Sequence, residues 1–242
     1  MWPFTKCQTL ADASFFETFT EHHCHLLPGV DDGVKTMEDS VAILSAYEKA
    51  GIKKVWLTPH IMEDMPNTTA HLRERFEELK EAYTGDIILH LAAENMLDNL
   101  FDERLANNDL LPLGKENNYL LVETSYFNPP IDMHTTLESI KASGYHPILA
   151  HPERYMYMDT KEYTNLKKMG IVFQLNLPSL AGMYGKTVQK KAEKLLKLGY
   201  YDISGTDTHR ITQFAYLSEK AKLNKKHINN ISSWYNPNLD VK

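Results

Sequence analysis

Short apolar runs and longer amphipathic segments alternate along most of the chain. The short runs are rich in Val, Ile, Leu and aromatic residues, as expected for buried strands. The longer segments carry apolar residues at helical spacing, for example Val41, Leu44 and Tyr47, with Gly51 as a stop. This alternation begins near residue 18 and predicts seven strand–helix units.

The boundaries of the predicted elements follow from the same pattern. The strands are expected at residues 18–25, 53–57, 87–92, 119–122, 146–150, 171–175 and 201–204. The helices are expected at residues 37–50, 69–83, 98–107, 133–143, 161–169 and 187–198, with a last helical stretch to about residue 226.

Strict alternation of strands and helices is typical of α/β proteins with a parallel sheet, most economically a closed barrel. An open, doubly wound sheet is the alternative. Neither a linker nor a shift in composition interrupts the alternation, so a single domain is expected at residues 21–228. An N-terminal arm at residues 1–20 would precede it, and a polar C-terminal tail at residues 229–242 would follow.

Composition narrows the class of protein. The chain has 242 residues and a net charge of −6, which argues against nucleic acid as a partner. It contains no apolar run of about 18 residues, so no membrane span is expected, and its start does not resemble a signal peptide. Two cysteines, Cys7 and Cys24, predict neither a disulfide framework nor a thiolate zinc site. A cytoplasmic protein is therefore expected.

Side chains that bind metals follow six of the seven predicted strands. His23 and His25 are two residues apart at a strand end, so their imidazoles point the same way. In a parallel barrel the carboxyl ends of the strands meet on one face, where active sites are found. The candidate metal ligands at these ends are His23, His25, Asp32, His60, Glu94, Glu123, His151, Asp207 and His209.

The number and kind of these ligands predict a cluster of ions. Any one of them alone is more simply a turn histidine or a salt-bridge partner, but chance does not readily explain the whole set. Nine side chains exceed the needs of one zinc-like ion, so two or three divalent ions are expected. Imidazole and carboxylate without thiolate favour Mn²⁺, Fe²⁺ or Zn²⁺, and Mn²⁺ is our first choice.

Clusters of this kind activate water for hydrolysis, above all at phosphorus. A phosphate group also needs a cation that can bind two of its oxygens, and Arg154 follows His151 by three residues. The alternative is a surface arginine paired with Glu153.

Several of these motifs together resemble a known family. They are H-C-H-L-L-P-G-V-D-D-G, T-P-H, A-A-E, L-V-E, L-A-H-P-E-R-Y and G-T-D-T-H. They are similar to the PHP (polymerase and histidinol phosphatase) superfamily, and most closely to its protein-tyrosine phosphatases from bacterial capsule and exopolysaccharide operons. This resemblance implies a distorted (β/α)7 barrel, the PHP fold, with three metal ions.

The resemblance also implies how the ligands are shared. His23, His25, Glu94 and Asp207 would hold the first ion. The second ion would be held by Glu94, Glu123 and His151, and the third by Asp32, His60 and His209.

Family substrates are phosphotyrosines on the tail of a bacterial tyrosine autokinase that controls polysaccharide synthesis. By this resemblance Arg154, Asp207 and His209 would be catalytic, and Tyr126, Phe127 and Tyr155 are candidates to stack on the phosphotyrosine ring.

Two departures from the family pattern bear on the site. Glu21 stands where an aspartate is usual, and His22 replaces an apolar residue. Arg210 is the only candidate for a second phosphate-binding arginine, and its register differs from the family's.

Two other functions remain open on the sequence. One is a PHP phosphatase for a small phosphomonoester such as histidinol phosphate. The other is a non-catalytic, metal-stabilised module that binds a kinase. The sequence leaves the oligomeric state open.

Overall fold

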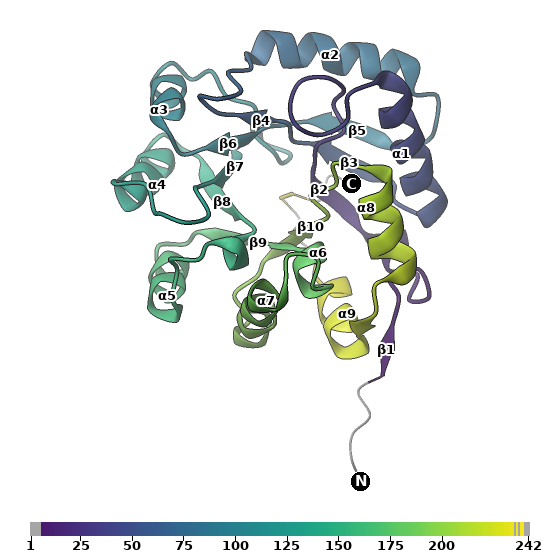
Figure 1. Cartoon of the computed structure of the whole chain (residues 1–242). Coiled ribbons are helices and arrows are strands. Elements are labelled where there is room, and N and C mark those ends of the chain that lie inside the picture. Colours follow the sequence, from purple (N-terminus) through teal and green to yellow (C-terminus); the bar gives the residue numbers. More distant parts are fainter. Residues whose placement is uncertain (1–5, 235, 237, 240–242) are drawn as a thin grey trace.

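A computed structural model describes residues 6–234, 236 and 238–239 of the chain. The strands lie at the centre of the molecule and the helices lie around them (Figure 1). The central strands are β2 (Thr20–Cys24), β3 (Lys54–Leu57), β4 (His60–Ile61), β5 (Ile88–Leu91), β6 (Glu94–Met96), β7 (Tyr119–Glu123), β8 (His146–Ala150), β9 (Val172–Asn176) and β10 (Ile203–Gly205).

These strands form two parallel sheets, which confirms the predicted α/β class and its parallel pairing. One sheet has six strands in the order β10-β9-β8-β7-β6-β4, and the other has three in the order β2-β3-β5. Each strand from β7 to β10 pairs with the next along the chain, as right-handed strand–helix–strand units require.

The second and third predicted strands each pass from one sheet into the other. β3 gives way to β4, and β5 gives way to β6, so the strand predicted at residues 87–92 ends at Leu91. Hydrogen bonds bridge these breaks, since the Thr58 amide donates to Cys24 O at 2.9 Å and the Glu94 amide to Pro59 O at 3.1 Å. Beyond the end of β10, the Asp207 amide donates to His23 O of β2 at 2.8 Å. The two sheets are thus joined by a hydrogen bond between β2 and the end of β10, and by the chain itself where β3 continues into β4 and β5 into β6.

Most predicted helices are confirmed. They are α1 (Met37–Ala50), α2 (Thr69–Ala82), α3 (Asn99–Ala106), α4 (Met133–Ala142), α5 (Thr160–Lys168) and α7 (Lys186–Leu198), and the structure adds a short α6 (Leu177–Leu180). Local chemistry explains α1, because the Thr36 side chain caps the Asp39 amide and Gly51 ends the helix with a φ of 104°. Its Ile43, Leu44 and Tyr47 side chains are buried against the sheet.

The last helical stretch differs from the prediction. It is divided into α8 (Ile211–Ala215), a π-helical turn η3 (Tyr216–Lys220), strand β11 (Leu223–Asn224) and α9 (Lys225–Ser232). β11 interrupts the helix because it pairs antiparallel with β1 (Cys7–Gln8), a partner more than 200 residues away in sequence. The tail predicted from residue 229 therefore begins inside α9, and its residues 235, 237 and 240–242 lie outside the described residues.

The predicted N-terminal arm, apart from residues 1–5 outside the described range, packs on the domain. Phe15 and Phe16 in the 3-10 turn η1 (Phe15–Thr18) are 3% and 1% exposed. Their rings meet edge to face with centroids 5.3 Å apart, and the centroid of the Phe16 ring also lies 5.3 Å from that of Phe214 in α8.

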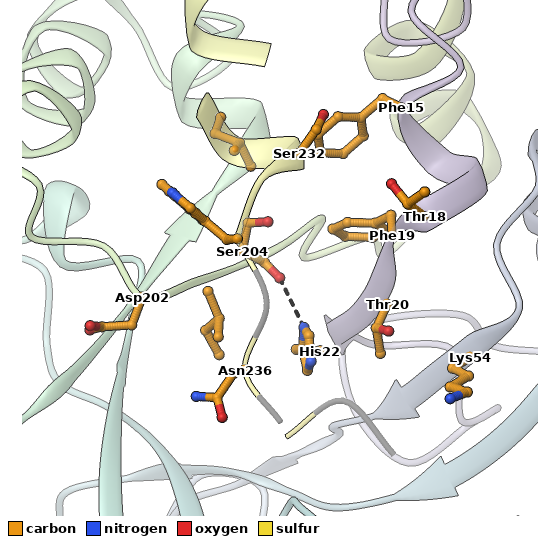
Figure 2. Close-up of a pocket in the computed structure, with 13 residues that line it drawn as sticks. Phe15, Thr18, Phe19, Thr20, His22, Lys54, Asp202, Ser204, Ser232 and Asn236 are labelled. Atoms are coloured by element: carbon orange, nitrogen blue, oxygen red, sulfur yellow. Dashed lines mark hydrogen bonds between the residues drawn. The ribbon is translucent and has the colours of Figure 1, made fainter. Parts of the chain in front are cut away.

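A cavity of about 200 Å³ lies at the amino ends of β2, β3 and β10 (Figure 2). Phe15, Phe19 and Trp234 line it together with His22 and Lys54. Among the described residues, we find no helix with the length and apolar character that crossing a membrane requires.

Candidate metal centre

A cleft of about 620 Å³ lies at the other end of the strands, where their carboxyl ends meet. The residues that line it come from seven separate segments of the chain. They are Asp32, His60, Glu94, Tyr126, His151, Arg154, Met183, Tyr184, Asp207, His209, Arg210, Thr212 and Gln213. Six of the nine candidate ligands are among them, and the other three, His23, His25 and Glu123, are buried beneath.

The two histidines of the H-x-H motif point into this cluster as predicted. Their Nε2 atoms are 3.1 Å apart, and both side chains are fully buried. His23 Nδ1 lies 2.6 Å from Gln174 Oε1, and His25 Nδ1 lies 2.8 Å from Asp31 Oδ2. Since these oxygens can only accept, both Nδ1 atoms donate, which leaves the Nε2 lone pairs directed at the centre of the cluster.

Glu94 is the centre of the carboxylates. Its Oε2 lies 3.1 Å from His23 Nε2, 3.3 Å from His25 Nε2 and 3.1 Å from His60 Nδ1. Its Oε1 accepts a hydrogen bond of 2.9 Å from His151 Nε2. A single carboxylate that faces four imidazoles is well suited to bridge two metal ions.

The remaining carboxylates surround the same imidazoles. Glu123 Oε1 is 3.0 Å from His60 Nδ1, and Asp207 Oδ1 is 3.4 Å from His25 Nε2. Asp32 lies at the mouth of the cleft, where its Oδ1 is 3.3 Å from His209 Nε2.

All nine predicted ligands fall into four groups whose donor atoms lie within 4.8 Å of one another. The groups are His25, Asp32, His60 and His209; His23, His25 and Asp207; His23, Glu94 and His151; and His60, Glu94 and Glu123. The structure thus brings the predicted set together in one place.

The chemistry of these donors fits divalent ions. His60 Nδ1 is buried and lies 3.1 Å from Glu94 Oε2 and 3.0 Å from Glu123 Oε1, which are buried too. None of these three atoms makes a hydrogen bond of good geometry. Buried polar atoms are almost always hydrogen-bonded, so converging atoms without such bonds are typical of ligands that share an ion.

When its histidines are protonated, the attraction between imidazolium and carboxylate groups stabilises the cluster. Burial opposes a charge on His23, but Glu94 and Asp207 outweigh it and raise the pKa of His23 to about 9. Burial also opposes a charge on Glu94, yet His23 and His60 hold the pKa of Glu94 well below its usual range. The Glu94 carboxylate therefore remains charged at neutral pH, as a metal ligand must be.

Two of the candidate ligands lie on strained backbone. His151 and Asp207 have φ values of 35° and 51°, in the left-handed region that non-glycine residues rarely adopt. Such conformations cost on the order of 1–3 kcal/mol each and persist where surrounding contacts impose them. They turn both side chains sharply at the ends of β8 and β10.

Two glycines allow the loops to approach the histidines. A Cβ atom at Gly33 would lie 2.1 Å from His25 O, and one at Gly205 would lie 2.7 Å from His23 Cβ. A larger residue at either position would displace the H-x-H segment.

Arg154 lies beside the cluster, as its predicted role in phosphate binding requires. Its Nη1 donates to Asp207 Oδ2 at 2.9 Å. The alternative partner, Glu153, is wholly buried and accepts instead from the Asn176 amide and the Tyr201 hydroxyl. Arg154 is therefore not a surface arginine paired with Glu153.

The predicted aromatic contacts require correction. Tyr155 is 0% exposed, and its hydroxyl donates to Ala150 O, so it packs beneath the site and cannot stack on a substrate ring. Phe127 is 74% exposed and lies outside the residues that line the cleft. Tyr126 does line the cleft, and Arg210, which is exposed, lines it too.

Several supporting residues were not predicted. Asp31 and Gln174 orient the two central histidines, and Asn176 donates to Asp207 Oδ2 at 2.7 Å. Asn176 ends the one strand that carries no candidate ligand, a position that could have drawn attention to it. Tyr184, whose hydroxyl lies 3.4 Å from Asp207 Oδ2, follows β9 and stands in no motif.

Glu21 supports the backbone of the site and does not join the cluster. It is fully buried and accepts from the amides of Thr206 and His23, at 2.9 and 3.1 Å. The longer side chain at this position thus ties β2 to the loop that carries Asp207.

Known proteins resemble this chain in sequence. The family profile described as capsular polysaccharide synthesis, CpsB/CapC, matches residues 19–232. The tyrosine-protein phosphatase YwqE of Bacillus subtilis (strain 168) is 28% identical over 205 residues, covering 82% of this chain and 80% of that protein. The tyrosine-protein phosphatase CpsB of Streptococcus pneumoniae is 28% identical over 202 residues, covering 78% and 82%.

A solved structure is also similar. It is one of the crystal structures of YwqE from Bacillus subtilis and CpsB from Streptococcus pneumoniae, which are described as unique metal-dependent tyrosine phosphatases. Its TM-score with this chain is 0.74 at 24% sequence identity. The match covers 93% of this chain and 100% of the other, so the two share their fold over almost the whole length.

Proposed function

The chain belongs to the CpsB/CapC family of capsular polysaccharide synthesis, and we propose that it is a metal-dependent protein-tyrosine phosphatase. The observation that carries this proposal is the convergence of nine metal-binding side chains and Arg154 at one cleft. Relatives of similar length are named tyrosine-protein phosphatases, which supports the same substrate class here.

The proposed metal centre holds two or three divalent ions, with Mn²⁺ as our first choice and Fe²⁺ or Zn²⁺ as the others. His23, His25, Glu94 and Asp207 would hold the first ion. Glu94, Glu123 and His151 would hold the second, and Asp32, His60 and His209 the third. The contacts of Glu94 with His23, His25 and His151 support its place in two of these sets.

Bound ions of this kind supply a hydroxide nucleophile at neutral pH and neutralise phosphoryl oxygens. Arg154 binds the phosphate group, since a guanidinium can donate to two of its oxygens at once. Asp207 accepts from Arg154 and so holds the guanidinium at the edge of the cluster. His209, 22% exposed by its side chain, stands at the mouth of the cleft and completes the proposed catalytic set of Arg154, Asp207 and His209.

The proposed substrate is a phosphotyrosine protein, in particular the tail of a bacterial tyrosine kinase that controls capsule or exopolysaccharide synthesis. A cleft open at the strand ends admits a phosphotyrosine carried on a flexible segment. Arg210 lines this cleft and can contact the phosphate or the polypeptide, and exposed Phe127 is available to the polypeptide outside it.

We further propose that the two hydrogen-bonded sheets are parts of one distorted (β/α)7 barrel. The hydrogen bond from the Asp207 amide to His23 O, and the passage of the chain from β3 to β4 and from β5 to β6, support closure. The barrel domain would comprise residues 21–228, with residues 1–20 as an arm and residues 229–242 as a tail. The proposed location is the cytoplasm, as the composition led us to expect.

The test combines elemental analysis of the purified protein with two assays run side by side, on a phosphotyrosine peptide and on histidinol phosphate. We expect bound Mn, Fe or Zn and faster hydrolysis of the peptide. A chelator should abolish the activity and added Mn²⁺ should restore it. Thiol alkylation should leave it intact, because Cys24 is fully buried and no cysteine takes part.

Other outcomes would refute particular parts of the proposal. Full activity after chelation would exclude the metal mechanism. Faster turnover of histidinol phosphate would identify a small-molecule phosphatase. A protein that binds metal and kinase but hydrolyses neither compound would be a non-catalytic module.

A further inference from the structure

The guanidinium of Arg154 lies between the rings of two tyrosines. Its Cζ is 4.3 Å from the centre of the Tyr126 ring and 4.4 Å from the centre of the Tyr184 ring. Tyr126 follows β7 and Tyr184 follows α6, so two distant segments enclose one cation. At these distances each ring attracts the guanidinium through its negative face.

One oxygen of Asp207 holds the edge of the same guanidinium. Asp207 Oδ2 accepts from Arg154 Nη1 at 2.9 Å, from Asn176 Nδ2 at 2.7 Å and from the Tyr184 hydroxyl at 3.4 Å. Asp207 Oδ1 faces His23 and His25 instead, at 3.6 and 3.4 Å. The carboxylate therefore divides its two oxygens between Arg154 and the histidine cluster.

This arrangement answers two physical difficulties of placing an arginine here. A free arginine side chain loses roughly 2 kcal/mol of rotamer entropy when it is held in one position. A guanidinium beside a site for divalent cations is also repelled by them. Two ring faces and one carboxylate oxygen restrain the guanidinium in advance and offset the repulsion.

We propose that Tyr184, together with Tyr126, positions Arg154 for the phosphate group. This inference rests on the proposed phosphatase function and makes Tyr184 a positioning residue. It also changes the expected role of Tyr126, because one face of its ring contacts Arg154 and is not available to a substrate ring.

Tyr184 offers the cleaner test of the two tyrosines. The Tyr126 ring also lies 5.7 Å from His151 and 6.2 Å from Tyr155, so replacing it would disturb the wall of the site. Tyr184→Leu removes the ring, whereas Tyr184→Phe removes only the hydroxyl. Tyr216→Leu is the matched control, because Tyr216 is 48% exposed and does not line the cleft.

The experiment measures the Kd of inorganic phosphate for the metal-loaded protein by calorimetry, and KM and kcat for a phosphotyrosine peptide. We expect Tyr184→Leu to raise both Kd and KM by about 3- to 30-fold, the loss of one cation–π contact, with a smaller change in kcat. Tyr184→Phe should remain within about 2-fold of wild type, since it retains the ring. Tyr216→Leu should match wild type.

Phosphate binding within experimental error of wild type in Tyr184→Leu would overturn the inference. Equal impairment of the Leu and Phe variants would assign the effect to the hydroxyl and would also overturn it. Metal content and melting temperature identify a variant whose fold is damaged. If Tyr184→Leu is damaged in this way, two double variants are measured instead, Tyr184→Phe with Arg154→Lys and Tyr184→Phe with Tyr126→Phe. A phosphate affinity that Arg154→Lys leaves unchanged would exclude the positioning role.

The same measurements separate this inference from the proposed function. If wild-type protein binds phosphate but does not hydrolyse the peptide, the proposed function fails. The positioning role is then still decided by the phosphate Kd of the Tyr184 variants.

Discussion

The two ends of the central strands differ in how many charged and metal-binding side chains they gather. At the carboxyl ends a cleft of about 620 Å³ contains carboxylates, imidazoles and Arg154. At the amino ends a smaller cavity of about 200 Å³ is lined by apolar residues such as Phe15 and Phe19 together with mostly uncharged polar ones, and η1 and α9 lie over it (Figure 2). Loops that follow parallel strands can carry functional side chains without disturbing the sheets, which explains why the charged groups collect there.

Two adjacent histidines show the difference most directly. Successive side chains of a strand point to opposite faces, so His22 lines the cavity whereas His23 lies in the cluster. His23 faces Glu94 and Asp207, which raise its pKa to about 9 in spite of its burial. His22 lies instead 3.3 Å from the carbonyl oxygen of Ser204, which accepts from its Nδ1. Neighbouring residues of one type thus differ in role because of the groups they face.

Replacement of Glu94 should give the largest effect at the carboxyl ends. Glu94→Gln keeps the shape of the side chain but removes the charge that faces four histidines. Because loss of a partner outside the ligand shell already costs 10- to 100-fold, we expect kcat to fall by more than about 100-fold, with loss of bound metal. Peptide hydrolysis and elemental analysis measure both.

Glu138→Gln is the matched control, since Glu138 is exposed on α4 and lies far from the cleft. It should retain wild-type kcat and metal content. A Glu94→Gln variant with near-normal turnover would show that the carboxyl-end cluster is not the catalytic site.

The candidate ligands were predictable because each depends on local geometry and on a rule for parallel sheets. The spacing of His23 and His25 determines that their side chains share a face of the strand. Most of the other ligands stand within a few residues of the end of a predicted strand, Asp32 follows the first strand by seven residues, and parallel strands end on one side of the molecule. The sequence therefore sufficed to place the ligands near one another.

The supporting residues were not predictable in the same way. Gln174, Asn176 and Tyr184 act through contacts with partners that are 151, 31 and 23 residues away, respectively, which only the folded chain determines. Tyr155 shows the converse, because proximity to Arg154 in sequence suggested a substrate contact, whereas its hydroxyl is satisfied by Ala150 beneath the site. Sequence proximity to a site does not give the direction of a side chain.

Replacement of Phe15 at the amino end should lower the stability of the protein and leave kcat unchanged, in contrast to a change at the carboxyl end. Phe15 is 3% exposed, lines the amino-end cavity and packs against Phe16 and Phe19. Phe15→Ala should lower the free energy of unfolding by about 3–4 kcal/mol, the usual cost of removing a buried phenyl ring. Urea denaturation measures this loss, and kcat measured on the folded protein should match wild type.

The milder Phe15→Leu serves if the alanine variant does not fold, with an expected cost of about 1 kcal/mol. A fall in kcat of the correctly folded variant, at full metal content, would show that the amino end takes part in catalysis.

The smallest expected effect comes from His22, and it tests the comparison at adjacent residues. His22→Leu removes one hydrogen bond to Ser204 O and should lower the free energy of unfolding by about 1 kcal/mol. His23→Leu, one residue further, removes a ligand and should abolish metal binding at the first site. Leucine is compatible with a β-strand at both positions, so a difference between the two variants would not come from β-strand propensity. If His22→Leu lost metal as His23→Leu does, the alternation of side chains along β2 would not separate the two histidines in solution, and the amino end would belong to the functional site. If it retains metal and kcat, position relative to the strand ends decides which of the two histidines has a catalytic role.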